Sequence, residues 1–316
     1  MSNSPVTALQ VGDRPLTGIS FKVTSVMIFV AMQSFIKASG DVHAGQIVFF
    51  RSFFAIFPIL IFLGYHGQLG SGFKTTRPGG HILRGIIGVA SMGFGFFALT
   101  RLPLPEAITL NYAQPLLVVA FSAIFLAEPV RLYRWGAVIF GLIGVVIVSW
   151  PKLSVGSDGM ESGELAGVIA ALLGAAFSAI AMLQVRSLVE TERSATIVLW
   201  FSVSASVMAL FTLPFGWSWL SLEQALLLAA GGLCGGVAQI LMTEGYRYAN
   251  ASTVAPFEYT SLILGLMVGY LVFSEVPTVH MMIGGLIVIG SGIFIIWRES
   301  QLGLQRGSAR KVTPPQ

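Results

Sequence analysis

The segment ALTRLPLPEAITLNYAQPLLVVAFSAIFLAE at residues 98–128 has a second, altered copy, GYRYANASTVAPFEYTSLILGLMVGYLVFSE, at residues 245–275. The offset of 147 positions pairs Tyr112 with Tyr259, Glu128 with Glu275 and Gly88 with Gly235. Both copies lie in strongly apolar surroundings. The sequence therefore predicts two related halves that share one kind of environment.

Composition identifies that environment. Of the 316 residues, 55% are hydrophobic and 10% are charged, and the mean hydropathy is +0.82. A soluble domain carries about 25% charged residues, so we expect an all-α integral membrane protein with the lipid bilayer as its main solvent. The single cysteine, Cys234, excludes an internal disulfide and a cysteine-based metal cluster. The basic residues are scattered, so no nucleic-acid partner is expected, and no motif points to a cofactor.

Runs of about 20 apolar residues are needed to cross a bilayer. Scanning between Gly, Pro and charged breakers predicts ten such spans. They lie near 17–37, 45–64, 81–100, 106–127, 130–150, 162–185, 194–215, 223–246, 251–273 and 277–297. We therefore expect a first five-helix repeat at 16–151 and a second at 162–297. A disordered cytoplasmic tail is expected at 1–15, where signal-peptide features are lacking, and a cytoplasmic tail at 298–316, disordered from Gly303.

The distribution of lysine and arginine predicts the orientation. With a cytoplasmic amino terminus, thirteen basic residues lie on the cytoplasmic side and only Lys37, Arg101 and Lys152 lie outside. This is a strong positive-inside bias, and ten spans return the chain to the cytoplasm. Five helices per half is an odd number, so the halves must be inverted relative to each other. Inverted repeats are typical of secondary transporters, whose substrate site lies between the repeats.

The segment Asn111-Tyr112-Ala113-Gln114-Pro115, followed thirteen residues later by Glu128, resembles the drug/metabolite transporter superfamily, EamA branch. In that family the fourth helix of each repeat carries Tyr-x-x-Pro, then Gly/Ala-Glu, then a glycine-rich closing helix; here those helices are WGAVIFGLIGVVIV and MMIGGLIVIGSGIFII. The resemblance implies a central cavity lined by spans one, three, four, six, eight and nine. The second copy departs from the pattern, with Leu262 in place of proline. FFRSFFAIFP in the second span is similar, more faintly, to riboflavin-uptake and S-adenosylmethionine-uptake members.

Two ionisable residues lie deep in predicted spans, where a charge costs at least about 2.5–3.5 kcal/mol. Glu258 lies about two turns into the ninth span and Arg51 a similar distance into the second. Glu258 is a candidate substrate contact or proton-coupling carboxylate; alternatively it pairs with Arg247, Lys22 or Arg84. Arg51 is a coupling charge or a structural arginine whose head group reaches polar surroundings. Lys22, near a helix start, is expected to reach the membrane surface with its head group.

Polar residues of the fourth span form a second candidate group. Asn111, Gln114 and Pro115 share a helical face, and Pro115 frees the carbonyl of Asn111. Tyr112 and Tyr259 are the repeat-related pair at one depth. The predicted substrate-binding residues are Asn111, Tyr112, Gln114, Glu258, Tyr259, Gln33 and Gln239, of which the glutamines are weaker candidates; the alternative for the polar groups is hydrogen bonding between helices.

These features predict a multi-pass secondary active transporter of the cell inner membrane that moves a small organic metabolite by alternating access. No P-loop is present, so ATP does not drive it directly. An enzyme would need clustered catalytic groups and a channel would need charged rings or a filter sequence, and neither is found. Riboflavin uptake is the best specific prediction; an amino acid, S-adenosylmethionine or a drug-like metabolite is the alternative. Transport direction, coupling ion and oligomeric state, a homodimer included, stay open.

Overall fold

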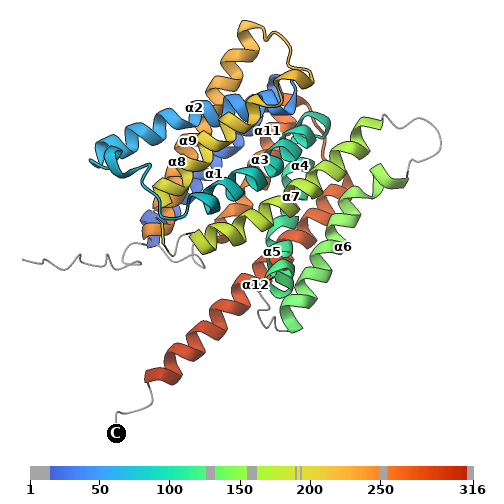
Figure 1. Cartoon of the computed structure of the whole chain (residues 1–316). Helices are drawn as coiled ribbons and strands as arrows, with labels where there is room; N and C mark the ends of the chain where they lie inside the picture. The colour runs from blue at the N-terminus through green and yellow to red at the C-terminus, as the bar shows by residue number, and fades with distance from the viewer. Residues whose placement is uncertain are drawn as a thin grey trace, which may run out of the picture.

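A computed structural model describes residues 15–125, 132–154, 162–188, 191–192, 194–248 and 255–311. Its regular elements, within those ranges, are all helical (Figure 1). In chain order they are α1 (Pro15–Ala38), α2 (Ala44–Tyr65), η1 (Leu69–Ser71), α3 (Pro78–Arg101), α4 (Leu104–Asn111), α5 (Ala113–Phe125), α6 (Leu132–Ser154), α7 (Ser162–Leu188), α8 (Ser194–Leu210), η2 (Leu213–Phe215), α9 (Leu222–Tyr248), η3 (Ala255–Tyr259), α11 (Thr260–Phe273) and α12 (Val279–Lys311).

Eight helical segments are long and apolar enough to cross a membrane, counting α4 and α5 together. Two shorter apolar helices, Ala195–Leu210 and Phe257–Phe273, fall at the seventh and ninth expected spans. Large apolar side chains such as Ile61, Phe140 and Leu271 point outward and are more than half exposed. An apolar exterior of this kind suits lipid rather than water. The chain is therefore a multi-pass membrane protein.

The helices of the two halves correspond along the chain and in space. α1 and α7 begin 147 residues apart, at Pro15 and Ser162, and so do α6 and α12, at Leu132 and Val279. α1 packs along α9, and the corresponding pair, α7 and α3, packs in the same way. α6 and α12 pack on each other so closely that a Cβ atom at Gly144 would lie 2.8 Å from the carbonyl oxygen of Gly284. This reciprocal packing is what a two-fold relation between the halves produces.

The fourth expected span, 106–127, corresponds to one candidate membrane span, Leu104–Phe125, within which the helix is interrupted. It breaks at Tyr112 between α4 and α5, where ψ is −4° rather than about −42°. The amide of Tyr112 bonds back three residues, to the carbonyl oxygen of Thr109 at 3.1 Å. The cause is Pro115, whose ring would clash with the carbonyl of Asn111 in a continuous helix.

The second copy breaks at the equivalent residue. Tyr259 ends η3 and precedes α11 with φ −67° and ψ −12°, close to the φ −68° and ψ −4° of Tyr112. The proline of the first copy is absent here, and the turn follows Pro256 instead. In both halves a turn at the equivalent tyrosine therefore precedes the longer α-helix of the span.

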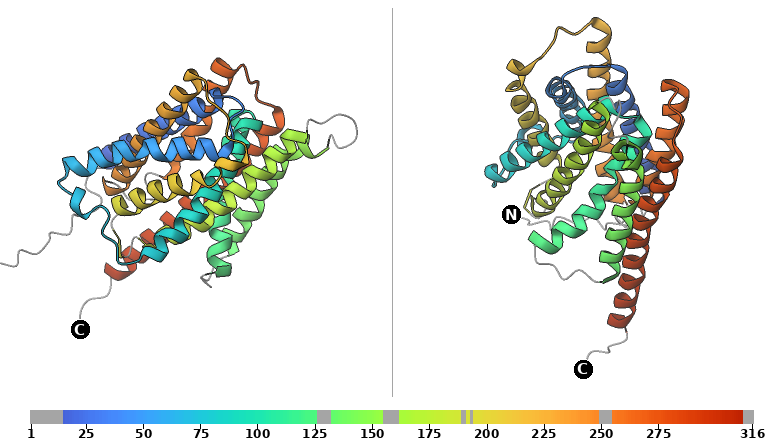
Figure 2. Two further views of the ribbon diagram at one scale, coloured as in Figure 1. Left: turned by 45° about the horizontal axis from the view of Figure 1, so that its top comes forward. Right: turned by 90° about the vertical axis from the view of Figure 1, so that its right-hand side faces the viewer.

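At the carboxyl end, α12 continues to Lys311 and extends beyond the rest of the bundle (Figure 2). The segment expected to be disordered from Gly303 is therefore helical as far as Lys311. An existing helix adds residues without a new nucleation cost, which explains why a polar stretch prolongs a membrane helix. The amino-terminal tail expected at 1–15 lies outside the described residues, apart from Pro15, which begins α1.

Candidate functional site

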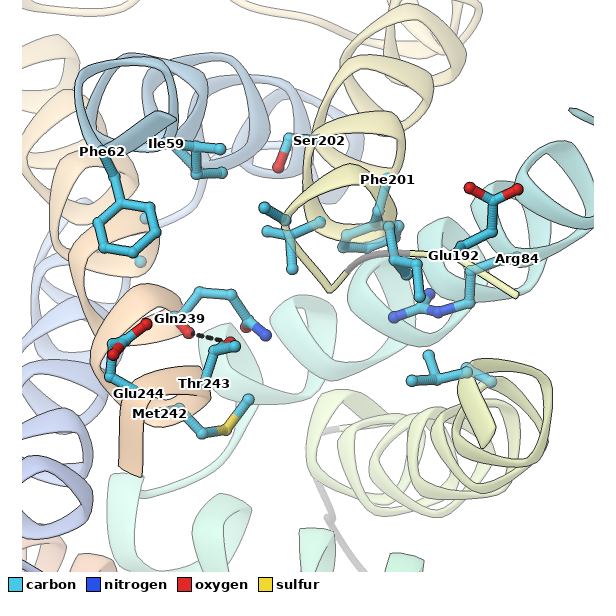
Figure 3. Close-up of a pocket in the computed structure, with 18 of the residues that line it drawn as sticks. Ile59, Phe62, Arg84, Glu192, Phe201, Ser202, Gln239, Met242, Thr243 and Glu244 are labelled. Carbon is cyan, nitrogen blue, oxygen red and sulfur yellow. Dashed lines mark hydrogen bonds between the residues drawn. The ribbon is translucent and has the colours of Figure 1, made fainter. Parts of the chain in front are cut away.

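A cavity of about 890 Å³ lies between the two halves. Its wall comes from α2, α3 and α5 of the first half and from α7, α8 and α9 of the second (Figure 3). The resemblance implied spans one, three, four, six, eight and nine. Among the described residues, spans three, four, six and eight contribute and spans one and nine do not; α2 and α8, the second and seventh spans, line it as well.

The cavity reaches one end of the bundle, which we call the open end. His66 and Gln68, just after α2, and Glu192, just after α7, belong to its lining. α2 has 22 residues and is therefore about 33 Å long. The link between α1 and α2, which contains Ser39 and Val42, lies at the other end of α2. We call that end of the bundle the closed end.

Two arginines from the first half line the cavity. Arg51 on α2 is only 9% exposed, and Arg84 on α3 lies over the ring of Phe201, 4.2 Å from its centroid. Nε of Arg51, and Nε and Nη1 of Arg84, are buried without a hydrogen-bond partner in the described part of the chain. Neither guanidinium forms an ion pair with a described residue. Placing a charged side chain inside a membrane span costs at least about 2.5–3.5 kcal/mol of free energy. Such a charge is therefore normally found where it binds a ligand or takes part in a conformational switch.

Each arginine is seated against a glycine, and the two glycines are repeat-related. A Cβ atom at Gly88 would overlap Nη1 of Arg84 and the ring of Phe201. A Cβ atom at Gly235 would lie 3.3 Å from Nε of Arg51 and 2.8 Å from Sδ of Met32. The absent side chains therefore make the room that the guanidinium groups occupy.

Amides and a carboxylate occupy another part of the wall. Gln239, Thr243 and Glu244 lie on α9, where the hydroxyl of Thr243 donates to the carbonyl oxygen of Gln239 at 2.8 Å (Figure 3). Gln114, on α5, contributes a second amide. The cavity thus combines cations, amides, carboxylates and aromatic surface, as a site for a small polar organic molecule does.

Glu192 connects two loops at the mouth of the cavity. Its Oε1 accepts hydrogen bonds from the amide of Thr76 and the hydroxyl of Thr75, both at 2.8 Å, and from the hydroxyl of Thr76 at 3.0 Å. These bonds favour the ionised form and lower the pKa of Glu192. The carboxylate therefore ties the segment before α3 to the link between α7 and α8.

The closed end is held by an ion pair across the two halves. Nζ of Lys37 lies 2.8 Å from Oε1 of Glu275 and donates to the carbonyl oxygen of Leu102 at 2.6 Å. Oε2 of Glu275 accepts from the amide of Leu104 at 2.8 Å. Gln224 adds a further link, donating to the carbonyl oxygen of Ser39 at 3.1 Å. The cavity therefore has a way out at one end and a hydrogen-bonded closure at the other.

A third cluster surrounds the helix breaks. The rings of Tyr112 and Tyr259 are in contact, with centroids 5.0 Å apart. The hydroxyl of Tyr112 donates to the carbonyl oxygen of Glu258 at 3.0 Å and meets the hydroxyl of Ser261. The side chain of Glu258 forms an ion pair with Lys22. Lys22 is 1% exposed, so the expectation that its head group would reach the membrane surface was wrong.

Several predicted residues thus meet the cavity and others do not. Arg51, Gln114 and Gln239 line it, whereas Asn111, Tyr112, Gln33, Glu258 and Tyr259 are not among its lining residues. Asn111 is exposed, and the turn at Tyr112 lies between it and Gln114. Oε1 of Gln33 is buried without a hydrogen-bond partner in the described structure. The partner of Glu258 is Lys22, one of the three alternatives considered.

Sequence reasoning missed Arg84, Glu192 and the closure by Lys37. Arg84 lies one turn into its expected span and was considered only as a cytoplasmic charge and a possible partner of Glu258. The available signal was Gly88, four residues later and paired with Gly235 in the repeat.

Comparison with known proteins agrees with this architecture. The EamA-like transporter family matches the chain twice, over residues 16–150 and 165–298. The chain is 29% identical to an S-adenosylmethionine uptake transporter of Rickettsia felis, over 90% of this chain and 94% of that protein. It is 28% identical to a pseudopaline exporter of Pseudomonas aeruginosa, over 86% and 93% of the two chains. It is 30% identical to a riboflavin transporter of Rhizobium johnstonii, over 77% and 78%. A protein of known crystal structure shares the fold, with a TM-score of 0.63 and 18% identity over 91% of this chain and 99% of that one.

Proposed function

Because the chain belongs to the EamA-like transporter family, we propose that it is a secondary active carrier that moves a small organic metabolite across the cell inner membrane by alternating access. The chain is a transporter and not an enzyme. The named relatives are transporters too. The observation that carries the mechanism is the cavity between the halves, open at one end and closed at the other by Lys37 and Glu275.

The proposal includes ten spans in two inverted five-helix repeats. The equal offsets of corresponding helices and the reciprocal packing of α1 on α9 and α7 on α3 support it. The shorter helices α8 and α11 supply the seventh and ninth spans. Both termini are cytoplasmic, because that orientation gives the excess of lysine and arginine inside. The open end then faces the cytoplasm, and the ion pair of Lys37 with Glu275 closes the outer side.

Alternating access follows if the two halves rock about the cavity. The closure joins Lys37, Leu102 and Leu104 of the first half to Glu275 of the second, so it breaks when the halves part at that end. At the open end, Glu192 of the second half accepts hydrogen bonds from Thr75 and Thr76 of the first half. These bonds fix the two loops at the mouth of the cavity. A carrier of this kind binds the solute from one side and releases it to the other.

The cargo is a small organic metabolite. Riboflavin, the specific prediction from the sequence, is supported by one named relative, and S-adenosylmethionine and pseudopaline by others at similar identity. Import and export are both compatible with the same cavity, because a reversible carrier follows the prevailing gradient.

The test is flux through the purified protein in liposomes. Uptake of labelled S-adenosylmethionine, riboflavin and amino acids is measured with and without the same compound inside. A carrier gives saturable uptake of at least one of them that unlabelled internal compound accelerates. Flux that rises linearly with concentration and ignores the internal compound would instead indicate a channel.

A further inference from the structure

The cavity contains two cations that lack an acceptor. Neither Arg51 nor Arg84 has a hydrogen-bonded carboxylate, carbonyl or hydroxyl partner in the described ranges, although both are largely buried. Both side chains line the same cavity. Burying two like charges in one cavity is unfavourable unless an anion compensates them. The empty arrangement therefore favours an anionic ligand.

The positions of both guanidiniums are built into the fold. Arg84 is held between Gly88 and the ring of Phe201, and Arg51 lies against Gly235. Gly88 and Gly235 occupy the same place in the two repeats. Stacking and close packing restrict the rotamers of both arginines, so their donors are positioned before a ligand arrives.

We infer that the cavity binds its substrate by a carboxylate placed between Arg51 and Arg84, an inference that rests on the proposed transport function. Arginine binds carboxylates through two parallel hydrogen bonds, which gives orientation as well as affinity. Gln114 and Gln239 then face the remainder of the molecule from α5 and α9.

The charge of the cavity favours a monoanion over a phosphate. Glu192 and Glu244 also line it, so a ligand with more than one negative charge meets carboxylates as well as the guanidinium groups. These carboxylates would repel the two negative charges of a phosphate. The single charge of a carboxylate can be balanced by the two arginines alone. An uncharged ring system such as a flavin would leave both arginines unpaired. A carboxylate-bearing metabolite of amino-acid type therefore fits better than riboflavin.

Matched ligand pairs test the inference on the purified full-length protein. The acids are S-adenosylmethionine, L-methionine and L-phenylalanine; their partners are decarboxylated S-adenosylmethionine, L-methioninamide and L-phenylalaninamide, and inorganic phosphate is a further probe. Ligand binding is measured by titration and by the midpoint of thermal unfolding. We expect at least one acid to bind while its partner and phosphate do not. Equal binding of acid and partner, binding of phosphate alone, or binding of none of the acids would overturn the inference.

Variants locate the carboxylate. Arg51→Gln and Arg84→Gln should each raise the Kd of the acid about 10- to 100-fold, the loss expected for one charge-assisted contact. Gly235→Ala keeps both charges but crowds Arg51, and should raise the Kd less. Arg298→Gln, at an exposed arginine of α12 outside the cavity lining, is the control and should leave the Kd unchanged.

The two proposals fail in different ways. If Arg51→Gln and Arg84→Gln transport and bind the acid as the unaltered protein does, the carboxylate site is wrong while the carrier stands. If the unaltered protein binds the acid but shows only linear flux, the carrier is wrong while the site stands.

Discussion

The ring of Tyr112 lies against the ring of Tyr259, with centroids 5.0 Å apart and planes inclined at 48°. The two residues are 147 positions apart and occupy the same place in the two repeats. Each marks the point where its helix breaks, with nearly identical backbone angles. The contact therefore joins the equivalent turns of the two halves.

Tyr112→Phe should destabilise this junction. The phenol donates to the carbonyl oxygen of Glu258 and contacts Ser261, and loss of a hydrogen bond between membrane helices costs about 0.5–1.5 kcal/mol. Thermal unfolding of the purified protein measures the change. Tyr259→Phe is the matched control, because no hydrogen bond to the Tyr259 hydroxyl is found among the described residues. Equal stability of both variants would contradict the assigned role of the Tyr112 hydroxyl.

Glu258→Gln should act on stability through Lys22. The substitution removes the carboxylate that pairs with Lys22, a lysine that is 1% exposed. Because Glu258 itself is 48% exposed, solvent screens the pair, and we expect a loss of about 1–2 kcal/mol. Adding Lys22→Met should restore part of it in a double-mutant cycle. Additive losses would show that the pair is not coupled, and a changed pH dependence of flux would instead support proton coupling by Glu258.

Glu192 should make stability depend on acidity. Hydrogen bonds from Thr75 and Thr76 lower its pKa below the ordinary 4.5 in the folded protein. Its contribution is therefore complete above about pH 5 and declines as the pH falls below 4.5 towards the folded-state pKa. Thermal unfolding between pH 6 and pH 3.5 should show this decline, and Glu192→Gln should flatten it. Glu223→Gln, at an exposed carboxylate of α9, should leave the profile unchanged; a decline that persists in Glu192→Gln would exclude Glu192 as its source.

The sequence predicted the architecture better than the site. Apolar length and the 147-residue offset identified the helices, because lipid requires long apolar spans whatever their neighbours are. Which polar side chains are buried, and which residues they contact, depends on how the helices pack. A single sequence does not reveal that packing. Lys22 lies near a helix start and was expected at the surface, yet it packs into the bundle against Glu258. Arg84 lies equally near a helix start but lines the cavity, because Gly88 leaves room for it. Asn111 and Gln114 were grouped by helical periodicity, yet Asn111 is exposed and only Gln114 lines the cavity.

Access to the cavity from each side of the membrane tests the central claim most directly. In a Cys234→Ser background, Gln239→Cys places one thiol in the cavity for an impermeant maleimide. With the closure intact, the thiol should react from the cytoplasmic side, in inside-out vesicles, and stay protected in right-side-out vesicles. Adding Glu275→Gln, which removes the ion pair with Lys37, should make it react from the outer side as well. Equal labelling from both sides before that substitution, or continued outer protection after it, would contradict alternating access through this cavity.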